Sequence, residues 1–224
     1  MTKKQPLLAL ALVMMAVLLA GCGITINGKP LSQQTDSGGG SEYGPDYVAQ
    51  HLTGDYWITY RYSASGSGTG SSDAVDMTLA RTSEGYYWKA FGDEILYIKN
   101  GDTYDTYLRT TADAGFTKFE NSQPVTQAEM EDSFSSFTAF MTQYGEAGSG
   151  MVKAGTETVA GRSTEKYTWN ASLLGISIDY AYWIDQETGV CLKYDYSMST
   201  KSEGAGMTFE CTEFKTSNVT LPAH

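Results

Sequence analysis

The sequence has few of the residues that usually carry catalysis. It contains only two histidines, His51 and His224, and three cysteines. Histidine is the commonest general acid–base residue and a frequent zinc ligand, so its scarcity argues against both acid–base chemistry and a zinc site. The sequence also has no Gly-x-Ser-x-Gly motif and no calcium-loop spacing of acidic residues. We therefore expect a protein that is not an enzyme and that holds neither a metal nor a cofactor.

Positive charge is also scarce. The chain has 15 lysines and arginines against 26 acidic residues, which gives a formal net charge of −11. Nucleic-acid phosphates and anionic lipid head groups repel such a chain, so we expect no nucleic-acid partner. Adjacent acids such as Asp93-Glu94 and Glu131-Asp132 follow from this composition. We expect them on solvated surfaces rather than in a glycosidase site.

The first 21 residues have the features of a bacterial lipoprotein signal peptide. Lys3 and Lys4 precede an apolar run over residues 7–19, which is too short to span a membrane comfortably, and Leu19-Ala20-Gly21-Cys22 has the form of a lipobox. We predict cleavage before Cys22, which moves the formal charge from −11 to −13 by removing two lysines. A diacyl or triacyl anchor on Cys22 would hold the protein outside the cytoplasm, on the cell membrane or on an outer membrane where one exists. The alternative is an ordinary secretory signal with a chance cysteine.

Composition divides the rest of the chain into three parts. Residues 22–44 begin at the cysteine predicted to carry lipid and are rich in Gly, Ser, Gln and Thr, which predicts a flexible tether without structure of its own. Residues 45–216 are long enough to bury a substantial core and are expected to form a single β-rich domain. Residues 217–224 remain as a C-terminal tail.

The sequence pattern of residues 45–216 predicts mostly β-strands. Along residues 56–62, large apolar side chains occupy every second position, and Asn100-Gly101 between two similar runs indicates a tight hairpin. A short helix is expected at residues 46–52. We predict a mainly β (α+β) fold, namely a curved antiparallel sheet or half-barrel of about ten strands with one or two helices packed on one face. The predicted strands span residues 54–64, 75–82, 86–91, 95–99, 103–109, 156–159, 163–170, 176–184, 190–199 and 207–215.

One amphipathic helix is predicted to interrupt the strands. Thr126 and Glu129 have the spacing of a capping box, and Gly145 is typical of a helix end. Apolar residues follow the capping box at steps of three and four and form a single stripe. We expect the stripe to pack on the core, and a mobile lid over an apolar cavity is the alternative. The stripe consists of Met130, Phe134, Phe137, Met141 and Tyr144, broadened by Phe140.

Cys191 and Cys211 are the two cysteines besides Cys22, and an even pair in an exported protein suggests a disulfide. Residues 190–199 and 206–215 are predicted to pair as a hairpin. A register that matches their apolar faces places the two cysteines on opposite faces, whereas a register shifted by one residue places them opposite each other. The sequence leaves both arrangements open.

Two segments carry a resemblance to a known family. Thr158-Val159-Ala160-Gly161-Arg162, followed by Tyr167, is similar to a turn and strand found in exported lipoprotein-carrier-like proteins. Tyr182-Trp183-Ile184-Asp185, with Thr188-Gly189, is similar to the W-I-D-x-x-T-G hairpin that follows it there. The order of strands, helix and hairpins also resembles the LolA/LolB-like family. The resemblance implies a curved antiparallel half-barrel that holds the acyl chains of a lipid or lipoprotein, but no family ligand residue matches position by position.

Two functions follow from these patterns. The first is binding of an apolar ligand, a lipid or lipoprotein acyl chain, in a half-barrel cavity. The second is a non-enzymatic interaction or sensor module that contacts protein or glycan through aromatic residues, because 16 tyrosines and four tryptophans are many for this length. A buried apolar groove would favour the first function, and an exposed aromatic row on the convex face of the sheet would favour the second. The residues predicted to line the apolar cavity are Ile58, Tyr60, Leu96, Ile98, Tyr182, Ile184, Tyr194 and Phe209.

Overall fold

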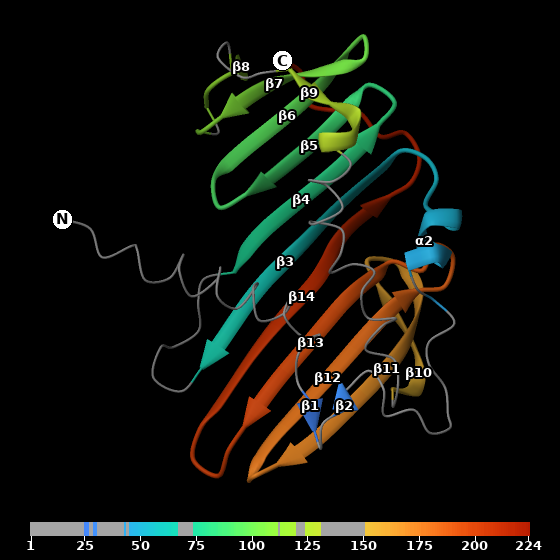
Figure 1. The fold of residues 1–224 in the computed structure, drawn as a ribbon, viewed down its shortest axis with the longest axis vertical. Helices are drawn as coiled ribbons and strands as arrows, with labels where there is room; N and C mark the ends of the chain where they lie inside the picture. Colours follow the sequence, from blue (N-terminus) through green and yellow to red (C-terminus); the bar gives the residue numbers. More distant parts are fainter. Residues whose placement is uncertain are drawn as a thin grey trace, which may run out of the picture.

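A single antiparallel sheet dominates the structure, a computed structural model of the chain (Figure 1). The structure describes residues 25–26, 29–30, 43, 45–66, 74–111, 113–119, 124–130 and 151–224. The strands of the sheet are β3 (Tyr56–Gly66), β4 (Val75–Thr82), β5 (Gly85–Ala90), β6 (Asp93–Asn100), β7 (Thr103–Arg109), β8 (Thr117–Lys118), β9 (Val125–Thr126), β10 (Val152–Val159), β11 (Arg162–Leu173), β12 (Ile176–Asp185), β13 (Cys191–Ser199) and β14 (Gly204–Lys215).

The strand order is β10-β11-β12-β13-β14-β3-β4-β5-β6-β7-β8, and β9 pairs with β7. All ten predicted strands are confirmed, so the fold class is mainly β as predicted. Two meanders, β3 to β8 and β10 to β14, meet where the last strand pairs with the first, from Ala205 opposite Gly66 to Lys215 opposite Trp57. The centre of the sheet is therefore built from the two ends of the domain.

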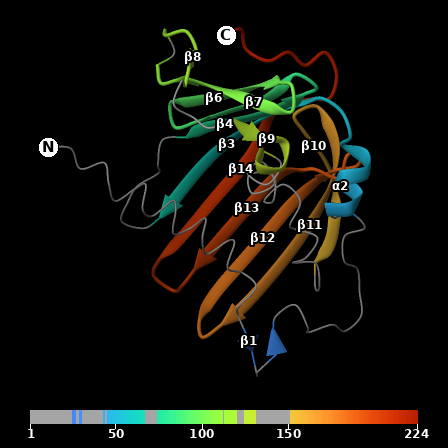
Figure 2. The same ribbon diagram turned by 45° about the horizontal axis from the view of Figure 1, so that its top comes forward.

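The sheet is open, twisted and curled at one end. β10 comes close to β14 although three strands lie between them along the sheet. Four strand spacings in a flat sheet would separate the two by about 19 Å, so the sheet must bend to bring them together. Figure 2 shows the accompanying twist, because β6 and β7 cross the view at a different angle from β11 and β12. The predicted curvature is present.

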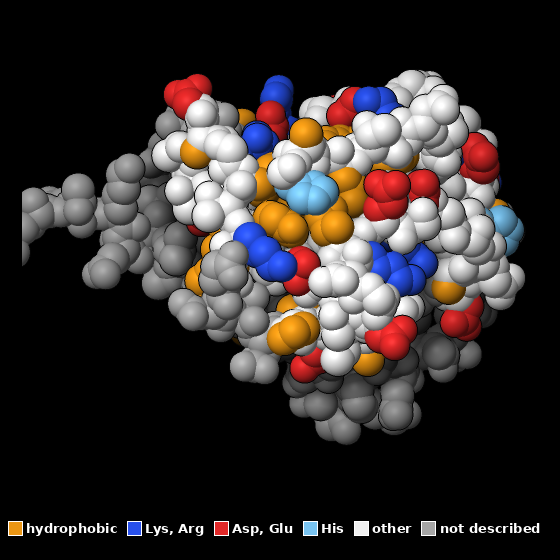
Figure 3. Space-filling view, turned by 90° about the horizontal axis from the view of Figure 1, so that it is seen from above, with side chains coloured by type: hydrophobic (Ala, Val, Ile, Leu, Met, Phe, Trp, Pro, Cys, Tyr) orange, Lys and Arg blue, Asp and Glu red, His pale blue; other side chains and the backbone are white. Residues whose placement is uncertain are grey.

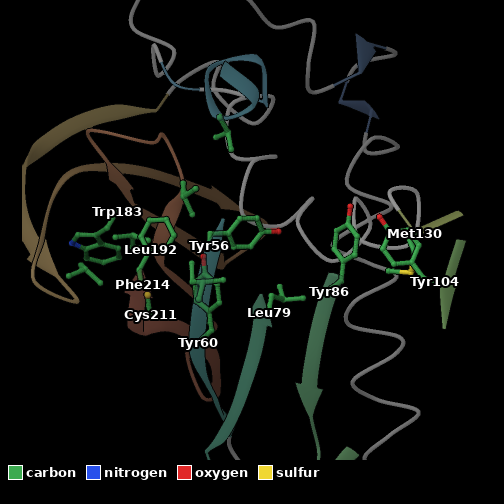
Figure 4. Close-up of a cluster of buried hydrophobic side chains, with 14 residues drawn as sticks. Tyr56, Tyr60, Leu79, Tyr86, Tyr104, Met130, Trp183, Leu192, Cys211 and Phe214 are labelled. Atoms are coloured by element: carbon green, nitrogen blue, oxygen red, sulfur yellow. The ribbon is translucent and has the colours of Figure 1, made fainter. Parts of the chain in front are cut away.

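Three hydrophobic clusters form the core among the described residues. The largest runs from Trp183, Leu192 and Phe214 at one end to Tyr104 and Met130 at the other (Figure 4). A second cluster gathers around Tyr167, Ile184 and Cys191, and a third around Ala80, Tyr87 and Leu96. The first cluster also contains Tyr56, Ile58, Tyr60, Leu79, Tyr86, Val48, Val159, Val190 and Cys211.

The helical predictions are confirmed where the structure describes them. Helix α2 (Pro45–His51) packs its buried Val48 against the first cluster. Residues 127–130 are helical, and the capping box forms as expected: the Thr126 amide donates to Glu129 Oε2 at 2.9 Å, and the Glu129 amide donates to Thr126 Oγ1 at 3.3 Å. The rest of the apolar stripe, from Phe134 to Tyr144, lies outside the described residues.

Both predicted terminal segments contain ordered parts. Within residues 22–44, β1 (Thr25–Ile26) and β2 (Lys29–Pro30) pair on either side of Asn27-Gly28, a typical two-residue hairpin sequence. At the other terminus, Leu221 packs against the third cluster, and the His224 ring lies 4.8 Å from that of Tyr107. Hydrophobic side chains gather around a histidine on this end of the molecule (Figure 3). Within the described ranges, no helix is long and apolar enough to cross a bilayer.

Candidate functional site

Seven aromatic rings form a continuous row across five adjacent strands. Directly opposed residues of antiparallel strands share a face, and two such series occur side by side, Trp169–Tyr180–Tyr196 and Tyr182–Tyr194–Phe209–Tyr62. The centroids of neighbouring rings are 4.8 to 6.4 Å apart, within the range of favourable aromatic contact. We call these seven residues the aromatic row.

Every ring of the aromatic row is half-buried, so the row is a partly accessible apolar surface. Burial raises the pKa of Tyr180, Tyr182 and Tyr194, so these phenols stay neutral at ordinary pH. The Tyr194 hydroxyl is buried and finds no hydrogen-bond partner within the described part of the chain. A buried, unpaired hydroxyl costs free energy, and a polar group brought in by a ligand would relieve that cost.

A polar groove with a volume of about 580 Å³ involves the same strands. Most of its lining residues alternate along the strands with the aromatic row and therefore point to the opposite face, but Trp169, Tyr180 and Tyr196 of the row also line it. The middle of the groove is a directly opposed series of small and polar residues, flanked by a second series that includes Asn170 and Asp179. The hydroxyl, amide and carboxylate groups of these series suit water or a hydroxyl-bearing ligand, and aromatic side chains also contribute to the lining. The middle series is Thr168, Ala181, Asp195, Thr208 and Ser63.

Trp183 closes one end of the groove and is held by charged neighbours. Its indole Nε1 donates to Glu157 at 2.6 Å, and the ammonium groups of Lys166 and Lys193 lie 4.5 and 5.0 Å from its ring centre. Because only 4% of Trp183 is exposed, the ring supports the groove rather than offering a stacking platform. Beside it, Asp195 Oδ1 is buried and unpaired among the described residues, which leaves an acceptor for water or a ligand.

The eight residues predicted to line an apolar cavity do not meet in one place. Six share the face of the aromatic row, because they occupy the same alternating positions of β3, β12, β13 and β14. Leu96 and Ile98 lie on the opposite face, since Leu96 is opposed by Tyr87, Tyr87 by Ala80, and Ala80 by Trp57. None of the eight lines the polar groove. The six that share the face are Ile58, Tyr60, Tyr182, Ile184, Tyr194 and Phe209.

Four members of the aromatic row were not among the predicted residues, namely Tyr62, Trp169, Tyr180 and Tyr196. The sequence did contain a pattern that identifies two of them. Tyr180 and Tyr182 alternate along β12, as Tyr194 and Tyr196 do along β13, so pairing these strands in register places all four on one face.

Cys191 and Cys211 are free thiols in the structure. Tyr194 stands opposite Phe209, so β13 and β14 pair in the register that matches their apolar faces. Each thiol donates to a backbone carbonyl two residues further along its own strand, at 3.1 Å for Cys191 and 3.3 Å for Cys211. The two residues also belong to different hydrophobic clusters, so the disulfide that the sequence left open is not formed here.

The two thiols are expected to resist alkylation while the chain is folded. Burial raises the pKa of both Cys191 and Cys211 to about 12, and only the thiolate reacts. Iodoacetamide at pH 8 should therefore label their peptides more than about a hundredfold more slowly in buffer than in denaturant, as followed by mass spectrometry. Fast labelling in buffer would contradict the buried thiols, and failure to label in denaturant without reductant would reveal a disulfide.

The structure describes one of the two acidic pairs, Asp93-Glu94, and places Asp93 at the surface as expected but Glu94 in the interior. Glu94 is 4% exposed, accepts hydrogen bonds from Arg109 and from the Tyr87 hydroxyl, and faces Lys89 at 3.4 Å. Burial alone would raise the pKa of Glu94, but these partners outweigh burial and lower it, so the group is a structural anion. Glu131-Asp132 and the lipidation residue Cys22 lie outside the described residues. In the part of the chain that is described, no three histidine, cysteine or acidic residues come together as a metal site.

No protein-family model matches the sequence, and no curated protein matches it either. Among solved structures, a DUF1329 family protein from Desulfovibrio piger is similar over 79% of this chain and 92% of its own, with 9% identity and a TM-score of 0.29. MucB, solved in complex with MucA, is similar over 80% of this chain with 14% identity and a TM-score of 0.34. A second structure, of Pseudomonas aeruginosa MucA/MucB, is similar over 80% of this chain with 15% identity and a TM-score of 0.33. The chain spans a little over half of MucB, 57% and 56% in the two structures. Matches of this strength assign neither a ligand nor a partner.

Proposed function

We propose that this chain is a lipoprotein of the bacterial cell envelope, anchored through Cys22, whose domain binds an apolar ligand on the aromatic row and catalyses no reaction. The observation that carries the proposal is that the seven rings of the row are half-buried and packed on one another, so they form a partly buried apolar surface rather than a fully exposed row. The series from Tyr182 to Tyr62 crosses four strands, a span of about 14 Å that suits an extended acyl chain. The unpaired Tyr194 hydroxyl offers a bond to a polar head or ester group.

The double substitution Tyr180→Ser with Tyr196→Ser is expected to weaken binding of the fluorescent fatty acid cis-parinaric acid by about tenfold. Both rings are half-buried members of the row, and their centroids lie 5.1 Å apart, so their removal interrupts the apolar surface. Fluorescence titration measures the affinity, and mass spectrometry of an organic extract of the full chain, purified without detergent, identifies any lipid that it carries.

The matched control is Tyr107→Ser. Tyr107 is also a half-buried tyrosine on a strand, but it stands opposite Leu96 and so lies on the other face of the sheet. Its substitution should leave the affinity unchanged. If both variants were folded and lost affinity for the fatty acid equally, the aromatic row would not be the binding surface.

The alternative is that the aromatic row contacts a protein or a glycan. The row favours this reading too, because half-exposed tyrosines and tryptophans are common at such interfaces. An empty lipid extract together with no binding of the fatty acid would move the assignment from a lipid to a macromolecular partner. The Tyr180 and Tyr196 substitutions would then be repeated against that partner.

A further inference from the structure

Four exposed apolar side chains lie along one edge of the sheet. Strands β11, β13, β3 and β5 run in the same direction, because each strand is antiparallel to its neighbours, and their ends therefore share an edge. In Figure 1 these strand ends run from the left of the upper half, at the β5–β6 turn, to the bottom of the sheet, at the β11–β12 turn. These ends carry Leu174 in the turn between β11 and β12, Ile176 at the start of β12, Met198 near the end of β13, and Phe91 in the turn between β5 and β6, which are 93%, 36%, 36% and 56% exposed. We call these four residues the apolar tips.

The backbone makes two of the apolar tips unusual. Leu174-Gly175 and Phe91-Gly92 are two-residue hairpin loops in which both residues have positive φ, at 53° and 80° and at 56° and 93°. Such type I′ loops favour Asn, Asp or Gly at the first position, because a bulky side chain is strained there. The chain thus places large apolar residues where local structure disfavours them, and Leu174 is almost fully exposed while Phe91 is more than half exposed. Residues held in a backbone conformation that is unfavourable for their side chain are common at functional positions.

From this arrangement we propose that the edge of the sheet carrying Leu174, Ile176, Met198 and Phe91 inserts into the surface of a lipid bilayer. Leu174 and Phe91 are separate protrusions on turns several strands apart, whereas Ile176 and Met198 lie on strands, on the face of the aromatic row. A protein partner needs a contiguous complementary surface, of about 1,000 Å² or more in total. A bilayer does not require a contiguous surface, because its apolar interior accepts each apolar side chain independently.

The proposal rests on the envelope location proposed above and adds an orientation to it. Residues 22–44 can extend over at most about 80 Å, so an anchor at Cys22 keeps the domain within reach of the membrane. Insertion of the tips would lay this edge of the sheet on the bilayer. The predicted net charge of −13 provides no attraction to anionic lipid, so the apolar side chains must drive the contact.

A probe at the tip tests the proposal without depending on lipidation. The chain from residue 22, with Cys22 replaced by a hexahistidine tag, is held on phosphatidylcholine vesicles that contain a nickel-chelating lipid. An NBD fluorophore is attached to Leu174→Cys or to Ala160→Cys, and the buried Cys191 and Cys211 stay unlabelled. Ala160-Gly161 is the matched control, because it is an exposed two-residue loop with φ of 50° and 76° at the opposite edge of the sheet.

The probe at position 174 should shift to shorter wavelength, brighten several-fold and be quenched by brominated lipid, while the probe at position 160 should remain in water. Equal behaviour of the two probes would overturn the proposal. So would a shift at position 174 that occurs without vesicles and grows with protein concentration, because that would indicate self-association. A negative result would leave the ligand-binding proposal untouched, since that one is tested by the tyrosine variants.

A second pair of variants excludes a structural role for Leu174. Asparagine tolerates positive φ, so Leu174→Asn and Ala160→Asn should both raise the melting temperature. If Leu174 instead packed within the protein, its replacement would lower the melting temperature, and the proposal would fail.

Discussion

Asp185→Asn is expected to lower the free energy of unfolding by about 3 kcal/mol or more, and the melting temperature by about 10 °C. The Asp185 side chain is 1% exposed, and its oxygens accept two bonds from Arg162 and two from Thr188 at 2.6 to 2.9 Å. Asparagine keeps the size of the side chain but replaces one acceptor oxygen with an NH2 group. That group would face the N–H and O–H donors of Arg162 and Thr188. The Arg162 guanidinium, largely buried, would also lose its main counter-charge. Thermal and urea unfolding monitored by circular dichroism measure the loss.

Glu187→Gln is the matched control for this variant. Glu187 accepts a bond from the same arginine at 2.7 Å, but its side chain is 77% exposed, so water replaces the interaction at little cost. We expect a change of at most about 1 kcal/mol. If Glu187→Gln proved as destabilising as Asp185→Asn, the stability of this hairpin would not come from the buried carboxylate.

Gly85→Ala is expected to destabilise the domain to a similar degree, by about 3 kcal/mol or more. Gly85 is buried at the start of β5, and a Cβ there would lie 1.9 Å from the carbonyl oxygen of Tyr97. The obstructing atom belongs to the backbone of β6, so no side chain can rotate away, and the two strands must separate locally. The loss is measured as a fall in the urea midpoint.

Gly54→Ala controls for the general effect of adding a methyl group. Among the described residues, no atom lies within 4 Å of a Cβ at Gly54, so this substitution should be nearly neutral. An equal fall in the urea midpoint for both variants would mean that the close contact between β5 and β6 at Gly85 is absent.

Most strands could be predicted because their cues are local. Period-two alternation and turn residues lie within a few positions of each other, as in the Asn100-Gly101 hairpin, where Asn100 pairs with Thr103. The pairing of β14 with β3 has no such cue, since the two strands are about 140 residues apart in sequence and Phe214 stands opposite Ile58. Two-residue strands such as β8 and β9 are too short to show any period.

The candidate site was predicted only in part, for a related reason. Alternation identifies which residues of one strand share a face, but not which face of a distant strand points the same way. Leu96 was grouped with Ile58 although three successive pairings place it on the opposite face, with Trp57. Tyr86-Tyr87-Trp88 offered no guidance, because apolar rings lie on both faces of β5.

The pairing of the last strand with the first also determines when the domain can be completed. The ribosome makes β3 before and β14 after all the other strands of the sheet, so the β3 edge that will bind β14 stays open while the strands between them are synthesised. An open edge with apolar side chains is prone to pair with other chains. Until residues 204–215 emerge, the nascent chain therefore needs protection from aggregation, and a truncation that removes β14 would leave both meanders without their shared centre.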